Sequence, residues 1–297
     1  MNKGKSEFSL AWWLIFIMIV STALVPILWA SKYNAENQYA MSCLGELAIV
    51  IIPVFVGFME IGRKREMRDL GFGGFPVKFL PFLLFVPIFA QPFINLITTP
   101  VVLLSRLLFD VEKVVEVIPC SPSEWIFAVL SVMVVAPFVE ELVFRGILMK
   151  LFEKYGVLTS LFMTSLGFSM VHFSPESAVL MFFLGFLLGV IRLSTGSLWA
   201  AIIAHSANNI MAFLPSVIPG LYDKITTPII IAEIILFPVM LFFMLKLSPE
   251  ERIREIRLEP EKKAGFSLGK LLSILVYVGY AGIIMTIKLI KTMAYYM

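Results

Sequence analysis

The chain has 297 residues, of which 59% are hydrophobic and only 15% are charged. Soluble domains are typically about 45–50% apolar and about 25% charged, so this composition excludes a soluble globular protein. The net charge of +3 does not indicate a nucleic-acid partner. We therefore expect an integral membrane protein of the all-α class, because helices satisfy their own backbone hydrogen bonds in lipid.

Runs of about 20 apolar residues, long enough to cross a bilayer, recur along the whole chain. In chain order the predicted spans are 8–30, 41–61, 78–106, 124–151, 157–173, 177–193, 197–214, 227–247 and 270–290. The first run is too long for the apolar core of a cleaved signal, about 7–15 residues, so we interpret it as a retained span. The prediction is one membrane domain, 1–297, built as a polytopic transmembrane helical bundle of eight to nine spans.

The predicted number of spans is eight or nine because the segment 78–106 is irregular. Four prolines interrupt it: Pro81, Pro87, Pro92 and Pro100. Proline removes a helix donor and kinks the axis, so we expect this segment to be bent or partly re-entrant.

The distribution of basic residues predicts the orientation of the spans. Most of the 24 lysines and arginines fall in segments on the same side of the membrane as the N-terminus. We therefore expect the N-terminus to be cytoplasmic. Residues 248–265 form a strongly polar stretch with alternating Glu and Arg, which we interpret as a cytoplasmic connector.

Two adjacent carboxylates, Glu140 and Glu141, lie inside the apolar span 124–151. Such residues are costly in hydrocarbon and survive when they pair, face a cavity or do chemistry. Glu141 and Arg145 are four residues apart, so they share a helix face and are expected to form an ion pair. Glu140 points about 100° away and has no basic partner on its own helix, which suits a general base. The alternative is that both glutamates only anchor neighbouring helices.

Both histidines of the chain lie in apolar spans. His172 ends the span 157–173, whereas His205 lies inside 197–214 with Asn209 one helical turn later on the same face. An isolated histidine on an apolar face is usually a hydrogen-bonded core residue. Two of them together with an unpaired glutamate indicate a functional site instead.

These side chains fit the hydrolysis of a carbonyl compound. Glu140 is the candidate to deprotonate a water that His172 orients, and His205 and Asn209 are candidate donors to the oxyanion. As an alternative, Glu140, His172 and His205 hold a zinc ion with one open position for water. One difficulty is depth, because the predicted edges put His172 near the outer end of its span and Glu140 deeper in the membrane.

The motifs together resemble the CAAX-protease and bacteriocin-processing family of intramembrane endopeptidases, which includes the type II prenyl-protein peptidase. They are EExxxR (Glu140, Glu141, Arg145), FxxxH (Phe168, His172) and HxxxN (His205, Asn209), all within the predicted catalytic helices 124–214. The resemblance implies that Glu140 and His172 activate water and that His205 and Asn209 form the oxyanion pocket. It implies that Glu141, Arg145 and Phe168 support them. The expected partners are membrane lipid and a membrane-bound or prenylated peptide, with or without zinc.

Three competing interpretations remain open. A proton-coupled transporter would use the same ionisable residues as a relay, although the chain shows no internal repeat of the kind expected for transporters. A catalytically idle relative would serve as a membrane scaffold or bacteriocin-immunity factor. A serine nucleophile, Ser169 or Ser206, is a third option without specific support.

Overall fold

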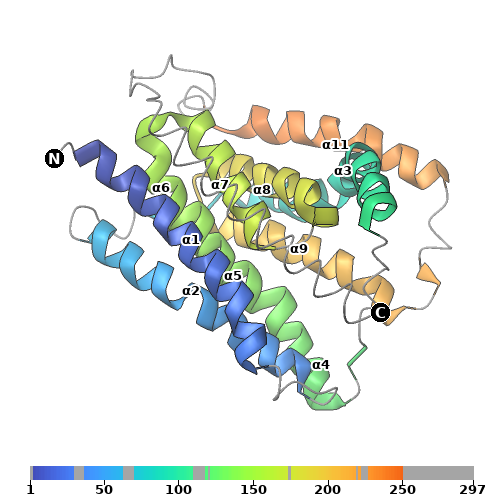
Figure 1. Cartoon of the computed structure of the whole chain (residues 1–297). Coiled ribbons are helices and arrows are strands. Elements are labelled where there is room, and N and C mark those ends of the chain that lie inside the picture. Colours follow the sequence, from blue (N-terminus) through green and yellow to red (C-terminus); the bar gives the residue numbers. More distant parts are fainter. Residues whose placement is uncertain are drawn as a thin grey trace.

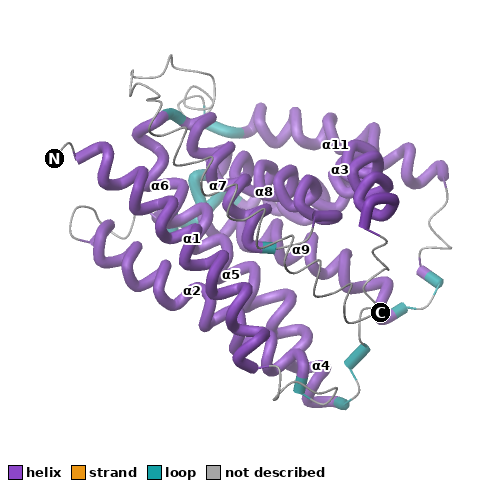
Figure 2. Tube along the Cα trace, in the orientation of Figure 1, coloured by secondary structure: helices purple, strands orange, loops and turns teal. Residues whose placement is uncertain are grey.

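The structure is a computed structural model of the chain, and all its regular structure is helical in the part that it describes (Figures 1 and 2). The described residues are 3–29, 37–62, 70–109, 118–119, 121–172, 175–218, 220–221 and 227–249. The predicted all-α class is therefore confirmed. The predicted connector 248–265, apart from its first two residues, and the predicted span 270–290 lie outside the described residues.

Most of the helices are continuous α-helices that run through the body of the molecule. They are α1 (Lys3–Trp29), α2 (Gln38–Gly62), α3 (Leu80–Phe109), α7 (Val157–Val171), α8 (Pro175–Thr195), α9 (Leu198–Val217) and α11 (Thr227–Leu247). Short 3₁₀ turns, η3 (Val77–Phe79) and η6 (Glu153–Tyr155), precede α3 and α7.

The span that carries the two adjacent glutamates is built differently, because it alternates between α- and π-helical segments. In order these are α4 (Pro122–Ala128), η4 (Val129–Val135), α5 (Ala136–Glu141), η5 (Leu142–Leu148) and α6 (Met149–Phe152). Both η4 and η5 are π-helical. Such segments are rare in proteins and frequent at functional sites.

Among the described residues, five helices are long and apolar enough to cross a membrane. Their apolar ranges are Gln38–Met59, Val77–Leu103, Pro122–Phe152, Ser177–Thr195 and Thr227–Leu247. The predicted number of eight to nine spans is thus not confirmed. The apolar parts of α1 and α7 are shorter, at Ser9–Val25 and Val157–Val171. The predicted span 197–214 forms α9, which is not among the five and carries His205, Asn208 and Asn209.

The proline-rich span 78–106 is one helix, so the expectation of a re-entrant segment is wrong. Pro87, Pro92 and Pro100 all lie inside α3, which continues for 30 residues. Pro81 lies in the first turn, where a missing backbone donor costs little. The packing of α3 against α8, α9 and α11 supports the helix over its length.

The long span α4–α6 lies between two groups of helices. On one side, α1 and α2 run beside each other and α2 packs along the span (Figure 1). On the other side, α5 packs against α9, which belongs with α3, α8 and α11. Each group has its own apolar core, one including Trp12 and Phe144 and the other including Leu188 and Met244. The two glutamates of α5 therefore lie where these cores meet.

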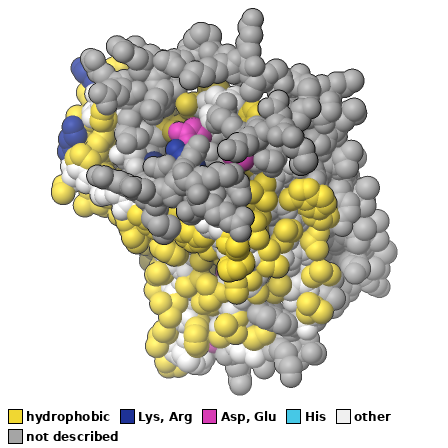
Figure 3. Space-filling view, turned by 90° about the vertical axis from the view of Figure 1, so that its left-hand side faces the viewer, with side chains coloured by type: hydrophobic (Ala, Val, Ile, Leu, Met, Phe, Trp, Pro, Cys, Tyr) yellow, Lys and Arg dark blue, Asp and Glu magenta, His cyan; other side chains and the backbone are white. Residues whose placement is uncertain are grey.

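The outer surface of the bundle is apolar. Large hydrophobic side chains of α2, α3 and α11 are exposed, among them Phe55, Leu96 and Phe242. Figure 3 shows a broad hydrophobic surface on one face, with most of the charged side chains visible there confined to its upper part. An exposed apolar surface of this extent is stable in lipid and not in water. The protein is therefore an integral membrane protein, while the cytoplasmic N-terminus stays a prediction.

Close packing of α2 on the long span predicts the effect of one substitution. A Cβ added at Gly57 would lie 2.5 Å from Cγ2 of Ile147, whose side chain is fully buried. We expect Gly57→Ala to lower the free energy of unfolding by about 1–3 kcal/mol because the core would be overpacked. Thermal unfolding in detergent measures this loss.

Gly74→Ala is the matched control, because nothing lies within 4 Å of an added Cβ there. The double variant Gly57→Ala/Ile147→Ala should lose less stability than the sum of the two single variants, because the smaller side chain makes room. Equal unfolding temperatures for Gly57→Ala and Gly74→Ala would contradict this packing.

Candidate active site

The long span and α7 form a helical hairpin that brings Glu140 and His172 to the same level. The turn between them ends at Gly156, whose φ of 101° is readily adopted only by glycine. Residues 140 and 172 lie at equal distances along the chain from this turn, and α7 packs back against η5 and α6. The expected difference in depth therefore does not occur, although α7 ends at Val171, two residues before the predicted edge.

A buried network of charges begins at Glu141, the last residue of α5. Its Oε1 accepts a hydrogen bond of 3.0 Å from Arg145 and lies 2.9 Å from Nδ1 of His205. The side chains of Glu141 and Arg145 are both completely buried. The predicted ion pair is thus confirmed, and it also holds a histidine of α9.

Arg145 extends this network to α8 and to α7, which carries the FxxxH motif. It donates a hydrogen bond of 2.7 Å to the carbonyl oxygen of Gly185 in α8. Its guanidinium carbon lies 4.7 Å from the ring centre of Phe168 in α7, a cation–π contact. A side chain at position 185 would meet Arg145 and Phe168, with a Cβ 3.2 Å from each. Glycine therefore allows α8 to approach closely enough to accept this bond.

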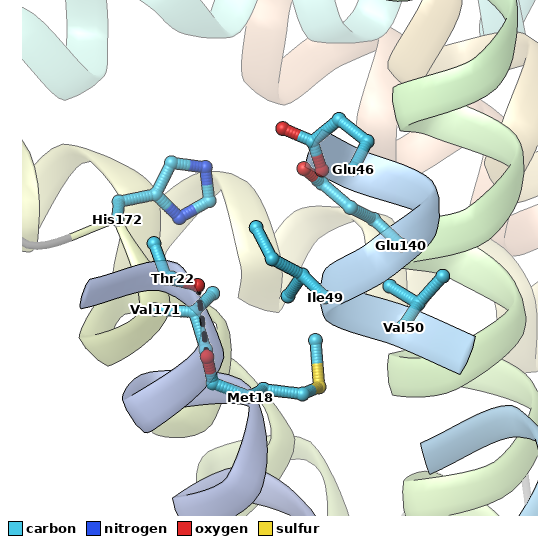
Figure 4. A pocket seen from close by; sticks show the side chains of 8 residues that line it. All are labelled: Met18, Thr22, Glu46, Ile49, Val50, Glu140, Val171 and His172. Carbon is cyan, nitrogen blue, oxygen red and sulfur yellow. Dashed lines mark hydrogen bonds between the residues drawn. The ribbon is translucent and has the colours of Figure 1, made fainter. Parts of the chain in front are cut away.

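Glu140 lies next to His205 at the edge of this network and also lines a cavity (Figure 4). The cavity measures about 200 Å³, which is room for several waters. His172 lines it from the end of α7, and Glu46 lines it from α2. Its other walls are largely apolar and come from α1, α2 and α7: Met18, Thr22, Ile49, Val50 and Val171. A carboxylate and an imidazole from different helices thus share one small cavity.

The hydrogen bonds of the two histidines determine which ring nitrogen carries a proton. Nδ1 of His172 lies 2.7 Å from the carbonyl oxygen of Phe168, which can only accept, so Nδ1 donates. Nδ1 of His205 likewise donates to Oε1 of Glu141, which also accepts from Arg145. A ring with its single proton on Nδ1 presents Nε2 as an acceptor. Nε2 of His205 lies 3.8 Å from Oε2 of Glu140.

Asn209 occupies an unexpected position, because its side chain supports the long span. Its Nδ2 donates a hydrogen bond of 2.9 Å to the carbonyl oxygen of Val132 in η4. In the π-helical segment the N–H of Ala136 bonds to Ser131, five residues earlier. The corresponding partner of Val132 is Pro137, which has no N–H. Asn209 thus satisfies a carbonyl that the backbone leaves unpaired.

The zinc alternative is not supported by the arrangement of the donors. Among the described residues, no three His, Cys, Asp or Glu side chains are grouped so that they could hold a metal ion. The predicted ligand set of Glu140, His172 and His205 is divided between the cavity and the buried network. Nδ1 of each histidine is already hydrogen-bonded within the protein.

Sequence reasoning missed one residue of the cavity, Glu46. It lies within the apolar run 41–61, so its type and surroundings gave the same signal that singled out Glu140. No motif surrounds Glu46, so the sequence alone does not connect it with Glu140. Only the packing of α2 against α5 brings it to the cavity.

The buried ion pair predicts a large loss of stability on removing one partner. Glu141→Leu leaves the charge of Arg145 buried without a carboxylate, which costs about 3–5 kcal/mol. We therefore expect Glu141→Leu to lower the unfolding temperature strongly. The double variant Glu141→Leu/Arg145→Leu removes both charges and should recover much of this loss. Equal destabilisation by the single and the double variant would show that the pair is not the interaction responsible.

The bond from Asn209 to Val132 predicts a second pair of variants. Asn209→Ala leaves a buried carbonyl unsatisfied and should cost about 1–3 kcal/mol of stability. Pro137→Ala restores an N–H at the position where a π-helical bond to Val132 can form. We expect the double variant to be more stable than Asn209→Ala alone, measured by thermal unfolding in detergent. A double variant less stable than Asn209→Ala alone would contradict the proposed pairing.

Comparison with known proteins gives one family match, in the middle of the chain. Residues 122–211 match the family model described as type II CAAX prenyl endopeptidase Rce1-like. The matched region begins at α4, extends into α9 and contains all the motif residues. No curated protein and no solved structure matches the chain. The family match does not favour the transporter alternative. This match supports membership of the chain in the CAAX-protease and bacteriocin-processing family.

Proposed function

We propose that the protein is an intramembrane endopeptidase that cleaves a peptide bond with a water activated by Glu140. The observation that carries this proposal is the cavity that Glu140 and His172 share. A general base must lie within about 3 Å of the proton it takes, directly or through one water. A water in this cavity satisfies that condition for a substrate carbonyl placed beside it.

The reaction proceeds in two proton transfers. Glu140 takes a proton from the water while the water oxygen bonds to the scissile carbonyl carbon, and His172 accepts a hydrogen bond from the same water through Nε2. The carbonyl oxygen becomes the oxyanion of a tetrahedral intermediate. The C–N bond then breaks, and the proton held by Glu140 passes to the leaving amine.

His205 stabilises the oxyanion in a specific protonation state. Because Nδ1 donates to Glu141, the ring has an N–H at Nε2 only when it is doubly protonated. Oε2 of Glu140 lies 3.8 Å from this Nε2. Asn209 uses one amide N–H for Val132 and retains a second for the substrate. Donors aimed at the developing charge are worth about 10²–10³ in rate each.

We propose as the substrate a membrane-bound or prenylated peptide of the CAAX type. The name of the matched family supports this class, since it describes a prenyl endopeptidase. The apolar cavity walls from α1, α2 and α7 give an acyl or prenyl chain favourable surroundings. The apolar outer face of α2 allows such a chain to approach from the lipid.

The mechanism predicts that Glu140→Gln abolishes cleavage while the fold remains intact. We expect kcat for a fluorogenic prenylated peptide to fall by about 10²–10⁴, the contribution of a general base. His172→Gln should also lower kcat. The measurement uses purified full-length protein in nanodiscs and compares kcat with KM.

Glu233→Gln is the matched control for Glu140→Gln. It makes the same exchange inside another apolar helix, α11, away from the cavity. It should leave cleavage unchanged. Undiminished cleavage by Glu140→Gln, or equal losses for the two variants, would rule out the role of Glu140.

A further inference from the structure

Glu46 is a third ionisable group at the cavity, and no family motif includes it. It lies on α2, outside the matched region 122–211. Figure 4 shows its carboxyl group next to that of Glu140, with His172 on the opposite side of the cavity.

Among the residues that the structure describes, no lysine or arginine lines the cavity and is placed to pair with Glu46. The residues from α1 are Met18 and Thr22, and the hydroxyl of Thr22 donates to the carbonyl oxygen of Met18 within its own helix, at 2.9 Å. The π-helical segment η4, which packs on α2, has no ionisable residue. Arg145 is already bound to Glu141 and Gly185.

Two carboxylates in a poorly solvated cavity cannot both remain charged. Like charges at short range disfavour double ionisation, so such a pair retains one proton. Glu140 has His205 within 3.8 Å, a partner for its charge, whereas Glu46 faces largely apolar walls. The proton is therefore favoured on Glu46.

We propose that Glu46 is a positioning residue of this site, which holds a proton and donates a hydrogen bond from its neutral carboxyl group to Glu140. This inference rests on the proposed function of Glu140 as the base. One oxygen of Glu140 then accepts from Glu46, and the other faces the water. During the reaction the proton of the water goes to Glu140 and on to the leaving amine. Glu46 keeps its own proton throughout, so the step remains balanced.

The test compares a neutral polar and an apolar replacement of similar size in the full-length protein. Glu46→Gln keeps a donor at this position, so kcat for the prenylated peptide should stay close to that of the wild type. Glu46→Met removes the donor, and kcat should fall by about 10- to 100-fold, equivalent to one hydrogen bond to a charged group, with KM little changed. Because Glu46→Met also removes a buried polar group, it should unfold at or above the wild-type temperature.

A spectroscopic measurement tests the proton independently of activity. In the infrared difference between wild type and Glu46→Gln, the wild type should show the carbonyl band of a protonated carboxyl group. Carboxylate bands in its place would overturn the proposal, because Glu46 would be charged. A loss in Glu46→Gln equal to that in Glu46→Met would also overturn it.

The outcomes for Glu140→Gln separate this inference from the proposed function. Full activity of Glu46→Met together with an inactive Glu140→Gln would remove Glu46 from the site and leave the mechanism of Glu140 intact. An active Glu140→Gln would end both proposals.

Discussion

The ion pair between Glu141 and Arg145 is the interaction on which the rest of the site depends. A charge buried in a membrane protein must be paired or hydrogen-bonded, and this pair meets the requirement by drawing groups from three other helices. It binds His205 of α9, the carbonyl of Gly185 in α8 and the ring of Phe168 in α7. These contacts fix the rotation of α5 about its own axis. The side chain of Glu140, the residue before Glu141, is thereby directed toward the cavity.

The same arrangement gives the two adjacent glutamates different chemistry. Glu141 is fully buried, accepts bonds from two cationic or donor groups and stays an anchor. Glu140 is 13% exposed and sees a cavity with two imidazoles near it, of which one lines the cavity and the other lies 3.8 Å away. Environment separates the roles of neighbouring carboxylates here, as it does in other enzymes with paired acids. The two glutamates would no longer have separate roles if α5 were rotated by one residue, about 100°, about its axis.

Several parts of this site could be predicted from the sequence because they depend on local spacing. The pairing of Glu141 with Arg145 follows from their separation by one helical turn, and the rarity of histidine drew attention to His172 and His205. The π-helical turns could not be predicted, since an α-helical period fits the same residues. Pro137 was the one local sign of an irregular helix at this point. Asn209 was expected at the oxyanion, and its bond to Val132 depends on that irregular backbone.

Local sequence patterns could not predict that α2 contributes Glu46 to the cavity. Glu46 is separated from Glu140 by four intervening helical elements in the chain, and only tertiary packing brings them together. The number of spans is not confirmed among the described residues for a related reason. Apolar runs such as 8–30 and 157–173 do form helices, but hydropathy alone does not set the length of each apolar helix.

The central claim is that a peptide bond is cut beside Glu140 in the cavity between α2, α5 and α7. A structure of the Glu140→Gln variant with an uncleaved prenylated peptide would test it most directly. The account predicts the scissile carbonyl carbon in this cavity, with room for one water between it and the side chain at position 140, and reacting atoms about 3–3.5 Å apart. A peptide bound elsewhere on the bundle, with the cavity closed to it, would contradict the account.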